Sequence, residues 1–95
     1  MDEKSVYREK LEARLDQWRA EIDKLKAKAA EAGADARKEY QDQVDALRGQ
    51  QEEARERLKE LDEATGDAWK NLKSRIEKVW DDLGDSVKKA TERFG

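Results

Sequence analysis

Carboxylates are the commonest side chains in this sequence that could do chemistry, and Asp81, Asp82 and Asp85 lie close together. With Gly84 between them, they have some likeness to a calcium-binding loop, in which carboxylate oxygens coordinate the ion. Aligned on Gly84, however, the segment lacks the alternating acidic positions and the closing glutamate of such a loop. We therefore expect no metal site here and no cofactor.

Other kinds of catalytic site have few candidate residues. The chain contains no histidine and no cysteine, which removes the commonest general base, the commonest transition-metal ligand and any disulfide. It has no glycine-rich phosphate loop, nucleophile elbow or zinc-ligand spacing. Paired carboxylates would need a cleft that shifts their pKa values, and a thin helical rod offers none. We expect a protein that is not an enzyme and takes no small-molecule substrate.

Composition points to long helices with a thin core. Charged residues make up 47% of the 95 residues and hydrophobic residues only 36%, below the roughly 45–50% of a typical globular domain. Proline is absent and strong helix formers are frequent. The 21 basic and 24 acidic residues nearly cancel, to a net charge of −3. Because basic and acidic residues alternate, the basic footprint that nucleic-acid binding requires is missing, and we expect no nucleic-acid partner.

The most regular pattern is a step of eleven residues in the C-terminal part. Four columns of apolar residues keep this step: Leu72, Leu83 and Phe94; Ala68, Val79 and Ala90; Trp69 and Trp80; and Ile76 and Val87. Eleven residues make almost three turns of α-helix, so each column follows one side of a helix. The pattern predicts a helix with a wide apolar stripe that must be covered.

The N-terminal segment carries apolar residues alternately four and three positions apart. Large side chains fill the first part of this heptad seam, at Leu11, Leu15, Trp18, Ile22 and Leu25. The seam continues with alanines and then with steps of four, through Ala29, Ala32, Ala36, Tyr40 and Val44 to Leu47. Heptad spacing is typical of coiled coils, and the extra steps of four locally relax the supercoil.

Glycines are the only residues that interrupt these patterns. Thr65-Gly66-Asp67 is the best break, because Gly66 suits the left-handed position after a helix and Asp67 suits the N-cap of the next. Residues 49–67 hold three basic and seven acidic residues, a balance of −4, and residues 68–95 hold seven basic and five acidic, a balance of +2. Folding back at Gly66 would therefore set opposite charges side by side. Gly33 is a weaker break. A hairpin centred on Gly49, or one helix continuing through Gly66, stays open as an alternative.

Together these patterns predict an all-α protein, with one domain over residues 1–95. We expect long amphipathic helices over about residues 4–64 and 67–93, folded back as a coiled-coil helical hairpin. One packed zone should contain Leu58, Leu61, Leu72, Ile76, Val79 and Leu83.

The hairpin should also self-associate, because the apolar residues of the segment 11–25 have no partner within the chain in that arrangement. We expect a homo-oligomer that buries the large apolar residues of both helices. These residues are Leu11, Leu15, Trp18, Ile22, Leu25, Leu58, Leu61, Trp69, Leu72, Ile76, Val79, Trp80, Leu83, Val87 and Phe94.

Two stretches, Tyr7 to Ala29 and Gly66 to Leu83, resemble a family of small bacterial coiled-coil proteins described as stress-inducible. The run Trp69-Lys70-Asn71-Leu72-Lys73 is similar to another small bacterial stress-protein family. The eleven-residue step resembles exchangeable apolipoproteins and late-embryogenesis-abundant proteins. These resemblances imply a role in stress and, for the last two families, lipid binding or protection from desiccation. They imply no catalytic residue.

Two functions follow as hypotheses. The first is a stress-associated scaffold that assembles through its apolar stripes. The second is reversible binding to a membrane surface through residues 68–95, where tryptophans and seven basic residues suit the lipid interface. Replacing Leu15 by Asp is expected to disrupt assembly and spare lipid contact. The charged N-terminus has no signal-peptide core, and no apolar run approaches the ~18 residues that would span a bilayer, so we expect a cytoplasmic protein.

Overall fold

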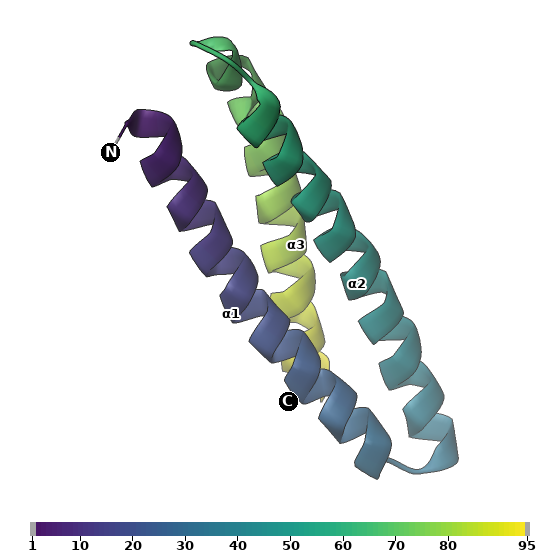
Figure 1. The fold of residues 1–95 in the computed structure, drawn as a ribbon. Coiled ribbons are helices and arrows are strands. Elements are labelled where there is room, and N and C mark those ends of the chain that lie inside the picture. Colours follow the sequence, from purple (N-terminus) through teal and green to yellow (C-terminus); the bar gives the residue numbers. More distant parts are fainter. Residues whose placement is uncertain (1, 95) are drawn as a thin grey trace.

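The computed structural model describes residues 2–94, which form three α-helices and one short 3-10 helix (Figure 1). Helix α1 spans Glu3–Glu31, α2 spans Ala34–Glu63, η1 is the 3-10 helix Ala68–Leu72, and α3 spans Lys73–Phe94. The described residues contain no β-strand. The prediction of an all-α protein is confirmed.

Helix α1 begins where the sequence supplies a capping side chain. The carboxylate of Asp2 accepts a hydrogen bond from the backbone N–H of Ser5 at 2.8 Å, which satisfies one of the free N–H groups at a helix start. This hydrogen bond also lowers the pKa of Asp2. The helix therefore starts about one residue before the predicted position.

Helix α1 does not continue to residue 64, and the predicted long helix is wrong. Ala32 and Gly33 adopt extended backbone angles, with φ/ψ of −78°/157° and −65°/166°, and connect α1 to α2. Two backbone hydrogen bonds stabilise this turn: Ala32 N–H donates to Ala29 O at 3.3 Å, and Arg37 N–H donates to Gly33 O at 2.8 Å. Breaking the helix here lets α2 cover the apolar face of α1, which a continuous helix would leave exposed. Gly49, the alternative centre of a hairpin, lies within α2 and is exposed.

The second turn lies where the sequence predicted it. Gly66 has φ +57°, the one positive φ among the described residues, and glycine adopts this left-handed conformation without steric cost. The chain reverses there, so the alternative of one helix through Gly66 is wrong. Asp67 is at the predicted cap position, but its side chain makes no capping hydrogen bond. It pairs instead with Lys70 at 3.6 Å. The predicted helix 67–93 is divided into η1 and α3.

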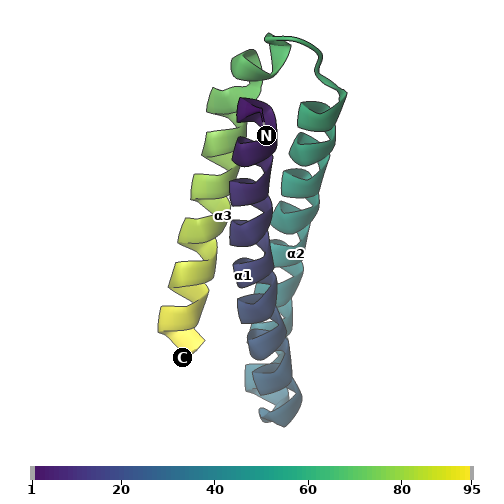
Figure 2. The same ribbon diagram turned by 60° about the vertical axis from the view of Figure 1, so that its left-hand side comes forward.

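The three helices form a rod of 52 × 19 × 18 Å. Helices α1 and α3 run in the same direction and α2 runs against both, and each pair of helices is in contact (Figures 1 and 2). The hairpin of α1 and α2 extends past the end of α3 at the turn formed by Ala32 and Gly33 (Figure 2). The fold is thus a three-helix bundle, with one more helix than the predicted hairpin.

A single apolar core occupies the axis of this bundle. Its buried residues come from all three helices and keep heptad spacing, for example Leu11, Leu15, Ile22, Leu25 and Ala29 in α1. The prediction that residues 11–25 lack a partner within the chain is therefore wrong, because α2 and α3 cover them. In α3 the fully buried face follows Ile76, Trp80, Leu83, Val87 and Ala90, which are alternately four and three residues apart. Heptad spacing thus determines burial in α3 as well, because each helix packs lengthwise against two neighbours.

Candidate functional site

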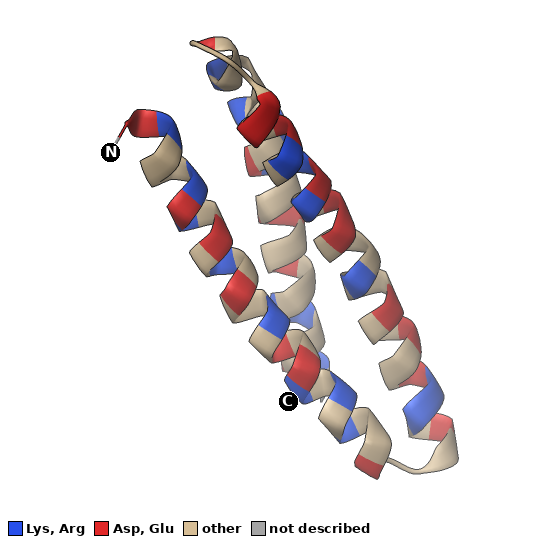
Figure 3. Cartoon of the chain, in the orientation of Figure 1, with Lys and Arg blue, Asp and Glu red and all other residues tan. Residues whose placement is uncertain are grey.

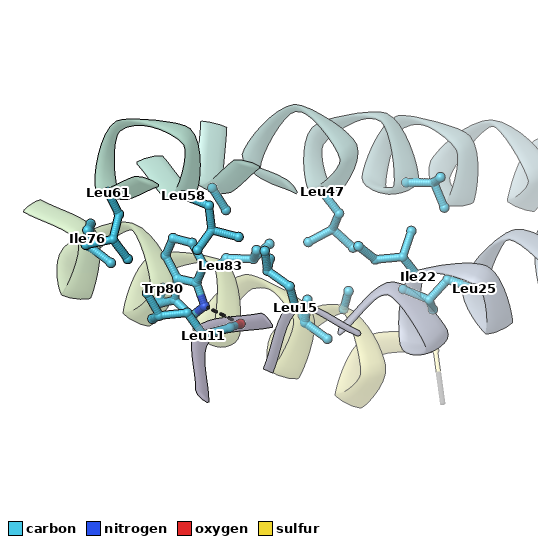
Figure 4. Packing of buried hydrophobic residues seen from close by; sticks show 14 of the residues in the cluster. Leu11, Leu15, Ile22, Leu25, Leu47, Leu58, Leu61, Ile76, Trp80 and Leu83 are labelled. Carbon is cyan, nitrogen blue, oxygen red and sulfur yellow. Dashed lines mark hydrogen bonds between the residues drawn. The ribbon is translucent and has the colours of Figure 1, made fainter. Parts of the chain in front are cut away.

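Fourteen of the fifteen residues predicted to mediate self-association lie in the core of the bundle or pack against it. Trp18, Leu72 and Val79 are partly buried and pack against the core. The side chain of Phe94, the last residue of α3, lies outside the described part of the structure. The remaining eleven are buried: Leu11, Leu15, Ile22, Leu25, Leu58, Leu61, Trp69, Ile76, Trp80, Leu83 and Val87. The predicted packed zone around Leu58, Leu61, Ile76 and Leu83 is confirmed, and it is joined to the apolar face of α1 (Figure 4).

Trp80 connects α3 to α1 at the centre of the core. Its indole N–H donates a hydrogen bond of 3.1 Å to the backbone carbonyl of Leu11 (Figure 4). Trp80 has no exposed surface, so its N–H needs a partner, and an unpaired one would cost about 1–3 kcal/mol. Trp80 therefore fixes the lengthwise position of α3 against α1.

Trp18 and Gly84 form a second contact between these helices. A Cβ atom built on Gly84 would lie 2.9 Å from Cζ2 of Trp18, closer than carbon atoms pack. The glycine thus leaves room for the indole ring, and the guanidinium of Arg14 lies over this ring, 5.0 Å from its centroid. The missing side chain at position 84 is a packing feature of α3.

An aromatic pair lies near the N-terminal end of α1. The rings of Tyr7 and Trp69 are 5.7 Å apart between centroids. The ammonium of Lys73 lies 5.3 Å from the first ring centroid and 4.9 Å from the second, an arrangement typical of cation–π contacts. Among residues 2–94, no group forms a hydrogen bond with the buried hydroxyl of Tyr7. Burial raises the pKa of Tyr7, and the nearby carboxylate of Glu77 raises it further, while Arg14 lowers it.

Two basic residues of α1 hold the C-terminal end of α2. Lys4 Nζ donates to the carbonyl of Ala64 at 2.9 Å, so it serves one of the carbonyl groups left free at a helix end. Arg8 pairs with both Asp62 of α2 and Glu12 of its own helix. The hydrogen bond from Arg8 to Asp62 is the main reason why the pKa of Arg8 is raised. Both contacts hold the first turns of α1 against the last turn of α2.

Charged residues of both signs line a groove between α1 and α2. This groove has a volume of about 450 Å³, and its charged residues are Arg8, Glu12, Asp16, Arg19, Arg55, Lys59 and Asp62. Four cations and three anions share it, so it favours no one sign of ligand. Among residues 2–94 no group of three or more acidic side chains is placed to hold a metal ion.

Several core residues were not among the predicted site residues. Ala54 is fully buried, and Val44, Leu47 and Ala90 belong to the same core cluster. Ala29 is buried as well. A signal for Ala54 was present, because heptad steps from Leu47 through Gln51 lead to Ala54, Leu58 and Leu61. Gly84 and Tyr7 carry no such signal, since their roles depend on neighbours from another helix.

Three helices packed side by side through their apolar faces define the class of this protein, an all-α three-helix bundle. A scan against protein-family models, a search of curated proteins and a search of solved structures found no match to the chain. Within residues 2–94, no helix combines the length and the apolar character needed to cross a bilayer. The resemblance to stress-inducible coiled-coil proteins stays a prediction.

Proposed function

We propose that this chain is a non-enzymatic structural and interaction protein that assembles with copies of itself through its apolar helix faces. One observation carries the proposal: apolar residues in heptad spacing from all three helices meet in a single cluster. Such faces recognise spacing and shape, so the same face of a second copy is an equivalent partner. The faces that the chain covers internally are therefore also the faces through which copies can combine.

The environment of the ionisable groups supports a structural role. Three described side chains have shifted pKa values, and each shift has a structural cause: Asp2 caps a helix, Arg8 pairs with Asp62, and Tyr7 is buried in a helix contact. Catalytic groups are shifted instead by clefts that also hold a substrate. Residues of both charge signs are interspersed along all three α-helices (Figure 3).

A role in the stress response and a place in the cytoplasm belong to the same proposal. They depend on the resemblance of Tyr7–Ala29 and Gly66–Leu83 to small bacterial stress-inducible proteins. A bundle of this kind would act by associating with other copies of itself.

Sedimentation velocity tests the proposal. Over concentrations from micromolar to millimolar, the mean mass should rise from that of one chain, 11.0 kDa, to at least twice that value. The measurement should be repeated after unfolding and refolding at the highest concentration, because exchange of helices between folded bundles is slow. A mass of one chain under every condition would contradict self-assembly.

A second candidate function is reversible binding to an anionic membrane surface through residues 68–94. The observation that favours it is the construction of this segment: η1 follows a four-residue connection, 64–67, and leads into α3, which has a continuous apolar face. Ile76, Trp80 and Leu83 are buried in the bundle. Lipid contact through this face therefore requires α3 to leave α1 and α2 and the hydrogen bond between Trp80 and Leu11 to break.

Flotation with vesicles separates the two functions. Lipid binding predicts flotation with phosphatidylglycerol vesicles and little with phosphatidylcholine vesicles. A basic residue near an anionic surface contributes about 1 kcal/mol, so the double variant Lys78→Glu and Lys88→Glu should reduce partitioning more than about tenfold. Both lysines are exposed, so self-assembly should not change.

Leu15→Asp cannot separate the functions as the sequence suggested, because Leu15 belongs to the core and a charge there would unfold the bundle.

A further inference from the structure

The connection between α1 and α2 has little that holds it in place. It consists of Ala32 and Gly33, both in extended conformations that any residue adopts. Apart from the two backbone bonds of this turn, its contacts include two long hydrogen bonds of 3.4 Å from the exposed Arg37 guanidinium to Ala30 O and Ala32 O. No side chain of the connection enters the core.

The sequence around this connection favours a continuous helix. Six of the ten residues from 27 to 36 are alanine, the residue with the highest helix propensity. Gly33 is the only residue there with a strong preference against a helix interior. Changing Ala32 and Gly33 from extended to helical angles would produce one helix from Glu3 to Glu63, roughly 90 Å long.

We infer that this connection is a hinge through which two copies of the chain exchange α1, and this inference rests on the self-assembly proposed above. Straightening the hinge removes α1 from its own α2 and α3 and leaves two complementary apolar faces uncovered. A second straightened chain offers the matching faces, and two long helices lying antiparallel close into a two-fold dimer.

The contacts made in the exchanged dimer are those already present in the single chain. The hydrogen bond from Trp80 to Leu11, the pair of Arg8 with Asp62 and the capping of Ala64 by Lys4 would all form between chains. Between the monomer and the exchanged dimer, the backbone conformation changes only at the two hinge residues, Ala32 and Gly33. The balance between monomer and dimer is therefore set by the conformation of the hinge and by protein concentration.

Two substitutions of Gly33 move this balance in opposite directions. A Cβ at Gly33 meets no atom within 4 Å, so Gly33→Ala fits the turn and favours the straight helix. Gly33→Pro fits the turn as well: φ is −65°, Ala32 before it is extended, and no described residue accepts a hydrogen bond from the Gly33 N–H. Proline within a straight helix would break it.

Sedimentation equilibrium after refolding at high concentration should show the opposite effects. Because a dimer contains two hinges, Gly33→Ala should raise the association constant about 30-fold. Gly33→Pro should lower it at least about a thousandfold and leave a folded monomer. Circular dichroism and urea unfolding provide the check that both variants keep the bundle.

Isotope labelling then identifies which contacts join the chains. In a dimer refolded from labelled and unlabelled chains, the indole proton of Trp80 should show nuclear Overhauser contacts to Leu11 of the other chain. A dimer in which these contacts stay within one chain would overturn the hinge, and so would equal association of the Gly33→Pro variant and the native chain. Both results would leave self-assembly standing, whereas monomers under every condition for all three chains would overturn self-assembly itself.

Discussion

The indole N–H of Trp80 donates a hydrogen bond of 3.1 Å to the backbone carbonyl of Leu11, and the two residues are 69 positions apart in the chain. Trp80 is fully buried and Leu11 almost fully. A directional bond in an otherwise apolar core selects one lengthwise alignment of α3 against α1, which apolar contacts alone would select less sharply. The loss of this hydrogen bond should therefore lower the stability of the bundle.

Trp80→Phe should destabilise the bundle by roughly 2–3 kcal/mol. The variant loses one buried hydrogen bond, worth about 1 kcal/mol, and leaves a small cavity in the core. Urea unfolding followed by circular dichroism measures the effect. Trp18→Phe is the matched control and should cost less, because Trp18 is only partly buried. Equal losses would contradict the special role of Trp80.

Gly84→Ala should destabilise the protein although alanine favours helices. The new methyl group would meet the ring of Trp18 at 2.9 Å, and moving that ring disturbs its packing and its contact with Arg14. Gly49→Ala is the matched control, since Gly49 lies within α2 with no atom within 4 Å of an added Cβ. The free energy of unfolding of Gly49→Ala should rise by about 1 kcal/mol, because alanine has a higher helix propensity than glycine.

The double variant Gly84→Ala with Trp18→Ala tests the cause. If the ring of Trp18 is the obstacle, Gly84→Ala should become stabilising, by about 1 kcal/mol, once that ring is absent. An unchanged loss in the double variant would show that another neighbour of Gly84 is responsible.

Gly66→Ala should destabilise the turn between α2 and η1. The φ of +57° at Gly66 is left-handed, and a residue with a Cβ pays about 1–2 kcal/mol there. A steric clash with neighbouring residues does not cause this loss of stability, because no atom lies within 4 Å of a Cβ added at Gly66. Gly66→Asn should recover part of the loss, since asparagine tolerates this conformation better than alanine. Equal stabilities of all three chains in urea would rule out this explanation.

Tyr7→Phe should leave the bundle at neutral pH as stable or more stable, by up to about 1 kcal/mol, because no described residue forms a hydrogen bond with the buried hydroxyl. The pKa of Tyr7 is raised by burial and by Glu77. The neutral form of Tyr7 is favoured in the folded state, so ionisation of Tyr7 does not reduce the free energy of unfolding below the pKa of an unfolded tyrosine, near 10. Stability is lost as the pH rises from there through the higher pKa of the folded state.

The pH dependence of unfolding checks the sign. Between about pH 9 and 11 the native chain should lose more stability than Tyr7→Phe, since only the native chain has this buried group to ionise. Parallel curves for the two chains over that range would exclude a raised pKa for Tyr7.

The apolar spacing allowed the helical class and most of the core to be predicted. Residues such as Leu15, Ile22 and Leu83 were selected because heptad or eleven-residue steps put them on one face, and the structure buries them. The turn at Gly66 was also predictable, because a glycine and a charge difference between the flanking segments coincide there.

The sequence marked Gly33 only as a weaker break, and local signals did not place a turn at Ala32 and Gly33. Alanines on both sides favour helix, and the turn uses backbone angles open to any residue. The helix breaks there because the large residues of α1 gain cover from α2 and α3, an effect of residues far away in the sequence. For the same reason Leu11 and Leu25 were assigned to contacts between chains although they are buried within one.

Small-angle X-ray scattering tests most directly whether the apolar faces are covered within one chain. At low concentration a single chain should give a radius of gyration near 15.4 Å and a longest dimension near 52 Å, apart from hydration. Only refolding at high concentration should add a species of twice the mass, with a longest dimension of roughly 90 Å, the length of the straightened helix. A longest dimension near that value in the dilute single chain would contradict the bundle.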